Sequence, residues 1–148
     1  MFPLIVPAYA ALLAFIYIFL SSRVIQSRVV TRIGLGTGGD RSLERRMRIH
    51  ANFAEYVPLA LLLLAFMEMQ GRPGWLLHLL CIALVAARIG HALALWDEKE
   101  IFPLRVASVS ATFFIMAAAA VSLLARALQI WRGNEGKRYR SFSIAPTV

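Results

Sequence analysis

A cluster of polar residues leads into an apolar run in the segment 44–67, and its spacing puts it on one face of a helix. Glu44, Arg48, Asn52, Glu55 and Leu59 follow one another at intervals of four, four, three and four residues, as expected for an α-helix. Charged side chains are costly at membrane depth, so such a cluster indicates a functional site. Arginines that outnumber the carboxylates around them suit an anionic ligand, because a guanidinium binds a carboxylate through two parallel hydrogen bonds.

Further polar groups are expected at the same end of the molecule. Arg88 and His91 are three residues apart on the third apolar segment, and Arg105 lies just inside the start of the fourth. Arg28 and Arg32 are four residues apart at the end of the first. The connections between segments one and two and between three and four lie on one side of the membrane, so all five residues approach that side.

Each of these residues also has a purely structural interpretation. Glu55 with Arg48 or Arg88 would form an ion pair that only fixes helix packing. His91 would be a hydrogen-bonded core residue, and Arg105 would extend to the lipid headgroups. A metal site is not expected, because the histidines lack the spacing of paired ligands.

The elements that must position these residues are four apolar segments. Hydrophobic residues make up 59% of the 148, and the mean hydropathy is +0.67, whereas soluble domains are about 45–50% apolar. A bilayer span needs about 20 residues. The sequence predicts one all-α domain over residues 1–148, an integral membrane four-helix bundle, with Ser42 as the N-cap of the second helix. The expected spans are 4–22, 43–69, 75–96 and 103–129, followed by a flexible tail at 133–148.

The formal net charge of +8 reflects arginines at the ends of the apolar segments, where they meet anionic lipid headgroups. No aromatic and basic platform accompanies them, so a nucleic-acid partner is not expected. The arginine-rich segment 23–48 favours a cytoplasmic first loop by the positive-inside rule. The sequence therefore predicts a multi-pass membrane protein whose site faces the cytoplasm.

At these residues the sequence resembles the MAPEG family, the membrane-associated proteins in eicosanoid and glutathione metabolism. The pattern that resembles the family's second-helix signature is Glu44-Arg45-x-x-Arg48-x-His50-x-Asn52-x-x-Glu55-Tyr56-x-Pro58. Arg88-x-x-His91 and Pro103-Leu104-Arg105 resemble segments of the microsomal prostaglandin E synthase branch. Residues 24–28 with Arg32 resemble the basic end of the first helix in the leukotriene C4 synthase branch.

The resemblance implies a homotrimer of four-helix protomers that binds glutathione between neighbouring subunits, near the cytosolic face. Glutathione has two carboxylates and one ammonium group, which suit arginines and a glutamate, and a nearby cation lowers the pKa of its thiol. The implied activity is a transferase that joins the thiolate to lipophilic electrophiles from the membrane, with reduction of lipid hydroperoxides as a side activity. By the same resemblance, Arg105 would stabilise the thiolate, and the residues that hold glutathione would be Arg28, Arg48, Asn52, Glu55, Arg88 and His91.

The sequence also departs from the family's specialised branches. Leu95 stands where some relatives carry a tyrosine, and Val106 stands where the prostaglandin synthase branch has a serine. Val29 replaces one member of an arginine pair of the leukotriene branch. These differences favour a less specialised glutathione transferase.

Two other functions stay open at this stage. One is a non-catalytic lipid-binding protein, although that branch has lost parts of the signature and Arg48, Asn52 and Glu55 are all present here. The other is a small four-span, proton-coupled multidrug exporter, although the expected first span contains no carboxylate.

Overall fold

The protein is a bundle of four long helices, described by a computed structural model over residues 4–142, with side-chain environments through residue 133. Each helix contains an apolar stretch long enough to cross a bilayer. This confirms the predicted all-α, four-helix membrane bundle. The helices are α1 (Ile5–Thr31), α2 (Arg41–Met69), α3 (Gly74–Ala94) and α4 (Phe102–Phe142).

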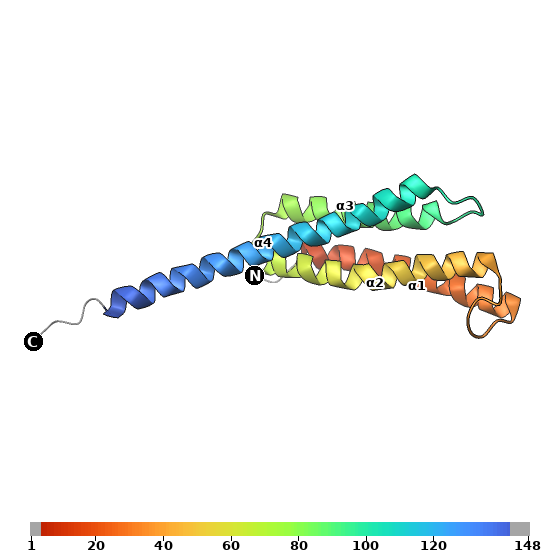
Figure 1. Cartoon of the computed structure of the whole chain (residues 1–148), viewed down its shortest axis with the longest axis horizontal. Coiled ribbons are helices and arrows are strands. Elements are labelled where there is room, and N and C mark those ends of the chain that lie inside the picture. The colour runs from red at the N-terminus through yellow and green to blue at the C-terminus, as the bar shows by residue number, and fades with distance from the viewer. Residues whose placement is uncertain (1–3, 143–148) are drawn as a thin grey trace, which may run out of the picture.

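The helices are arranged as two antiparallel pairs. Figure 1 shows α1 beside α2 and α3 beside α4, with both pairs running along the same axis. The connections 32–40 and 95–101 lie at one end of the bundle, as the sequence analysis expected, and the α2–α3 connection lies at the other. The start of α4 therefore comes to the same end as the start of α2.

The junction between α1 and α2 differs in detail from the prediction. α1 continues beyond the expected end of its span to Thr31, and Arg32 then adopts a left-handed conformation with φ of 56°. The predicted N-cap at Ser42 is wrong, because Asp40 occupies that position. The Asp40 carboxylate accepts a hydrogen bond of 2.8 Å from the backbone N–H of Leu43, which would otherwise lack a partner in the first helical turn.

α4 is longer than expected and projects past the other helices (Figure 1). Residues 133–142 belong to this helix, whereas the sequence predicted a flexible tail from residue 133. Extending a formed helix needs only one residue to be ordered per new hydrogen bond, and no proline follows Pro103 until Pro146. The last part of the expected tail, 143–148, lies outside the described residues.

α1 joins the bundle through one narrow stripe. Its buried residues Val6, Leu13, Leu20 and Ser27 follow one another at intervals of seven, the spacing that keeps one seam of a helix against its neighbour in a left-handed supercoil. The rest of α1 is mostly exposed in the protomer. Most of its surface therefore contacts lipid or a neighbouring chain.

α3 and α4 approach closely at Gly90. A Cβ atom at this position would lie 2.7 Å from the Ser108 hydroxyl oxygen of α4, so a glycine allows the two helices to come together. This approach lets side chains of α3 on the same side reach the backbone of α4.

At the opposite end of the bundle, a side chain of α2 caps α1. The Glu68 carboxylate accepts hydrogen bonds of 2.7, 2.7 and 2.8 Å from the backbone N–H groups of Leu4, Ile5 and Val6. These donors have no partner within the first turn of α1, and a negative charge is favourable there. Glu68 therefore fixes where α1 begins relative to the end of α2.

We expect Glu68→Ala to destabilise the protein by about 1–2 kcal/mol, the usual cost of losing a helix N-cap. Thermal unfolding of the detergent-purified protein, followed by circular dichroism, measures this. Glu98→Ala in the exposed 95–101 connection is the matched control and should leave the melting temperature unchanged. Equal melting temperatures for Glu68→Ala and wild type would contradict the capping role.

Candidate functional site

The polar face predicted for α2 is only partly covered in the protomer. Ile49 and Phe53 turn into the core, and this leaves Arg48 and Glu55 exposed and Asn52 half-buried between them. Within the described side chains, neither Arg48 nor Glu55 makes a side-chain hydrogen bond or an ion pair. The structural alternative, in which Glu55 pairs with an arginine of the same chain, is therefore not the arrangement found.

Arg88 lies behind this face and is buried, with 2% of its surface exposed. One terminal nitrogen, Nη1, donates a 2.7 Å hydrogen bond to the side-chain oxygen of Asn52. The other, Nη2, donates to the Ser108 carbonyl oxygen at 3.3 Å and to the Thr112 hydroxyl. The third nitrogen, Nε, is buried without a partner among the described residues. Arg88 thus links α2, α3 and α4 through neutral acceptors alone.

His91, one turn after Arg88, is also buried, with 4% exposure. It follows Arg88 at the helical interval of three, so both residues belong to the covered face of α3. Neither side chain is open to solvent in the protomer, although the resemblance had placed both next to glutathione. The sequence spacing identified their shared face, and the packing determined that this face is covered.

Arg105 is partly buried at the start of α4 and forms an ion pair. Its Nη1 lies 2.8 Å from a carboxylate oxygen of Glu100, and the two side chains are 41% and 36% exposed. This carboxylate attracts the guanidinium and offsets part of its positive potential. Glu100 was not among the predicted site residues, although its position five residues before Arg105 in the short connection was a usable signal.

Arg105 also borders an apolar groove of about 350 Å³ on α4. Phe113 lines the same groove, and its ring meets that of Tyr56 edge-on, with ring centres 5.2 Å apart. Tyr56 directly follows Glu55. The groove next to Arg105 therefore lies close to the polar face of α2, on the side of the bundle formed by α2 and α4. Its remaining lining residues are Phe102, Val106, Val109 and Ser110.

Arg28 is used within the first connection. Its Nη1 donates to the carbonyl oxygens of Ile33, Gly34 and Gly36 at 3.2, 3.0 and 3.3 Å, and its Nη2 lies 3.3 Å from the Met47 sulfur. These contacts hold the loop against the start of α2. The family resemblance assigned Arg28 to glutathione binding, but in the protomer its guanidinium holds the 32–40 connection.

The histidine of the α2 motif faces α1 instead of the polar face. The His50 ring stacks on Tyr17 with ring centres 4.9 Å apart, and its Nε2 hydrogen-bonds the Ser21 hydroxyl at 3.1 Å. Tyr17 and Ser21 are four residues apart on α1, and this polar pair within an apolar span could have identified the contact from the sequence.

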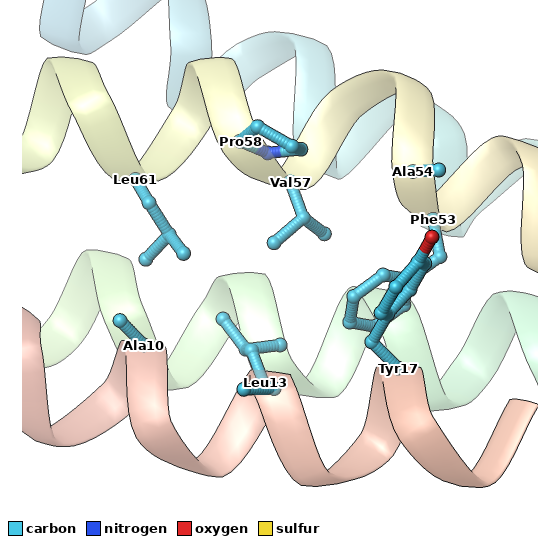
Figure 2. Close-up of a pocket in the computed structure, with 9 residues that line it drawn as sticks. Ala10, Leu13, Tyr17, Phe53, Ala54, Val57, Pro58 and Leu61 are labelled. Atoms are coloured by element: carbon cyan, nitrogen blue, oxygen red, sulfur yellow. The ribbon is translucent and has the colours of Figure 1, made fainter. Parts of the chain in front are cut away.

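Next to this stack, an apolar cavity of about 390 Å³ opens between α1 and α2. Figure 2 shows side chains from the two helices pointing toward each other across it, with Tyr17 and Phe53 at one end. The lining is almost entirely hydrocarbon, so it suits an apolar group. The lining residues are Ala10, Leu13, Ala14, Tyr17, Phe53, Ala54, Val57, Pro58 and Leu61.

The fold and this site define a class of small four-helix membrane protein with an arginine-rich polar face near one membrane surface. The model of the MAPEG family matches residues 6–125, and the chain belongs to that family. It is similar to the "Inner membrane protein YecN" of Escherichia coli strain K12 and of strain O6:H1, each 36% identical over 105 residues. The alignment covers 71% of this chain and 79% of each relative. The name of these relatives states a membrane and no reaction.

We expect Arg28→Ala to loosen the 32–40 connection, because three backbone carbonyl groups lose their donor. Hydrogen–deuterium exchange of the peptide that covers residues 33–36 should become faster, and that of the α3 core should not change. Arg28→Lys is the matched control, since an ammonium group can keep only part of this set of contacts. Unchanged exchange in Arg28→Ala would contradict the structural role.

Proposed function

We propose that this protein is a glutathione-dependent membrane transferase that joins the glutathione sulfur to lipophilic electrophiles. The main support is the charge balance behind the polar face of α2. Arg88 is buried with neutral acceptors only, and Arg48, one turn before Asn52 on α2, is exposed and unpaired among the described residues. A buried cation without a counter-charge is costly, so an anionic ligand on this face would be stabilising.

Glutathione fits the length and the charges of this face. Arg48 and Glu55 are seven residues apart, and at 1.5 Å per residue this separates them by about 10 Å along α2. A tripeptide-like ligand spans about 10 Å when extended, at 3.3–3.6 Å per residue. Arg48 suits a terminal carboxylate, Glu55 suits the ammonium group, and Asn52 between them suits a peptide group.

We further propose that the site lies between the subunits of a homotrimer and faces the cytoplasm. The polar face is exposed in the protomer although it belongs to a membrane-spanning helix, and charged groups facing lipid are costly. A neighbouring chain would cover it. The cytoplasmic orientation is supported by the arginines of segment 23–48, which border the connection at the same end.

Bound glutathione supplies the nucleophile of the reaction, its sulfur. Arg105 would hold the sulfur in its anionic form, because a guanidinium favours a thiolate and does not itself release a proton. The apolar groove next to Arg105 would hold the hydrophobic part of the electrophile and exclude water from it. Glu100 competes with the thiolate for Arg105 and so limits this stabilisation.

A non-catalytic lipid-binding function is the second candidate, and the cavity between α1 and α2 favours it (Figure 2). Such a protein would bind an apolar ligand through α1 and α2 without using Arg48 or Arg105. Glutathione binding that depends on Arg48 therefore separates the two functions.

We expect millimolar glutathione to raise the melting temperature of the detergent-purified protein and not that of Arg48→Ala. A ligand at about 100 times its Kd stabilises the native state by about 2.7 kcal/mol, which corresponds to a rise of roughly 5–11 °C for a chain of this size. Arg126→Ala, which removes an exposed arginine elsewhere on α4, is the matched control and should keep the full rise. A folded wild type that does not respond would refute the glutathione site.

We expect Arg105→Ala to reduce kcat for conjugation of a reactive aromatic halide by about 10²-fold or more, with little change in KM for glutathione. Glu100→Gln should act in the opposite direction. With the competing charge removed, the thiolate forms at lower pH, so the rising limb of the pH–rate profile moves to lower pH. The absorbance of the conjugate measures both. A shift to higher pH in Glu100→Gln would contradict the role of Arg105.

A further inference from the structure

We propose that Arg88 is a positioning residue, which acts through Asn52 and makes this side chain a fixed hydrogen-bond donor toward the ligand. This inference rests on the proposed function for the identity of the ligand. It departs from the role that the family resemblance implies for Arg88, which is direct contact with glutathione.

The contact between the two side chains has only one chemically possible orientation. A guanidinium group carries donors and no acceptor, so the Asn52 atom that lies 2.7 Å from Arg88 Nη1 must be the amide oxygen. The choice between the oxygen and the nitrogen of an amide is often ambiguous, and here the partner removes the ambiguity. The amide nitrogen of Asn52 is therefore left for another partner.

The guanidinium is itself held in place from behind. Nη2 donates to the Ser108 carbonyl oxygen and to the Thr112 hydroxyl, and that hydroxyl in turn donates to the same carbonyl at 3.0 Å. The close approach of α3 and α4 at Gly90 keeps Ser108 near α3. Rotation of Arg88 would break these contacts, so it presents Nη1 to Asn52 in one direction.

Burial separates the tasks of Arg88 and Asn52. Arg88 is 2% exposed, while Asn52 is half-buried on the same face as the exposed Arg48 and Glu55. A ligand on this face can therefore meet Asn52, and the charge of Arg88 reaches it through the amide. A cation bound to the amide oxygen also makes the amide N–H groups better donors, because hydrogen bonds in a chain polarise one another.

The arrangement selects one kind of ligand atom. With its oxygen turned toward Arg88, Asn52 presents its N–H donors to the ligand, so it favours an acceptor, such as a peptide carbonyl or a carboxylate oxygen. A donor group at the same place would face a donor and be rejected, since an unpaired buried polar group is costly. Arg88 would thus contribute to specificity without touching the ligand.

A double-mutant cycle on glutathione affinity tests this inference. Isothermal titration calorimetry on the full-length, detergent-purified protein would compare wild type, Asn52→Ala, Arg88→Met and the double variant. Each single variant should weaken Kd by about tenfold or more, and the double variant should be no weaker than the weaker single variant, because both changes remove the same contact. Losses that multiply in the double variant would mean that Arg88 touches the ligand itself and would overturn the proposal.

Asn52→Asp provides a test that does not require the Arg88 variants to fold. The new carboxylate would pair with Arg88 and raise the melting temperature of the ligand-free protein, while glutathione binding weakens by tenfold or more because the outward donor is lost. A rise in melting temperature with an unchanged Kd would mean that Arg88 has only a structural role, which would overturn the proposal. A fall in melting temperature would contradict the contact between Arg88 and the residue at position 52. Glu68→Gln is the matched control, which should lower stability at the far end of the bundle without changing Kd.

The same set of variants distinguishes this inference from the proposed function. A wild type without any response to glutathione refutes the proposed function. The orientation of Asn52 is then decided by the ligand-free melting temperature of Asn52→Asp alone, where a rise supports the contact with Arg88 and a fall overturns it.

Discussion

The architecture of this protein depends on one buried cation. Arg88 lies inside a membrane bundle, where a guanidinium needs hydrogen-bond partners, and those of its two terminal nitrogens come from α2 and α4. These contacts join three helices at one level, next to the close approach of α3 and α4 where Gly90 meets Ser108. Since no carboxylate among the described side chains contributes to the set, the charge would be available to a ligand on the exposed side of Asn52, as proposed above.

α1 is held in the bundle by contacts that do not involve Arg88, and it lies on the side of the molecule away from the polar face. It packs through a stripe with a repeat of seven residues, is capped by Glu68 at one end and is followed by a loop that Arg28 holds at the other. The aromatic stack of His50 and Tyr17 and the apolar cavity lie on this side. The polar face and Arg105 lie toward α2 and α4. Each protomer thus has an apolar side at α1 and a polar side toward α2 and α4.

Membership of the MAPEG family is consistent with a protomer that has one polar and one apolar face. It does not specify the reaction, which has to be argued from the residues of the site. The relatives matched in Escherichia coli are named as inner membrane proteins, without an activity. The proposed chemistry depends on how Arg105 divides its charge between Glu100 and a ligand, and on a polar face that is exposed in the single chain. Arg48 and Glu55 are exposed in the protomer, and they are the charges that the proposed ligand and the proposed neighbouring subunit would cover.

The sequence by itself determined the four spanning helices, the polar face of α2 and the common end at which the arginines approach, because hydropathy and helical periodicity are local properties of the chain. It did not determine that Asp40 caps α2, that α4 continues through residues 133–142, or that Arg28 holds a loop. Nor did it separate the buried Arg88 and His91 from the exposed Arg48 and Glu55. A helical repeat shows which residues share a face, whereas burial and hydrogen-bond partners depend on contacts between segments far apart in the chain, which only the tertiary structure brings together.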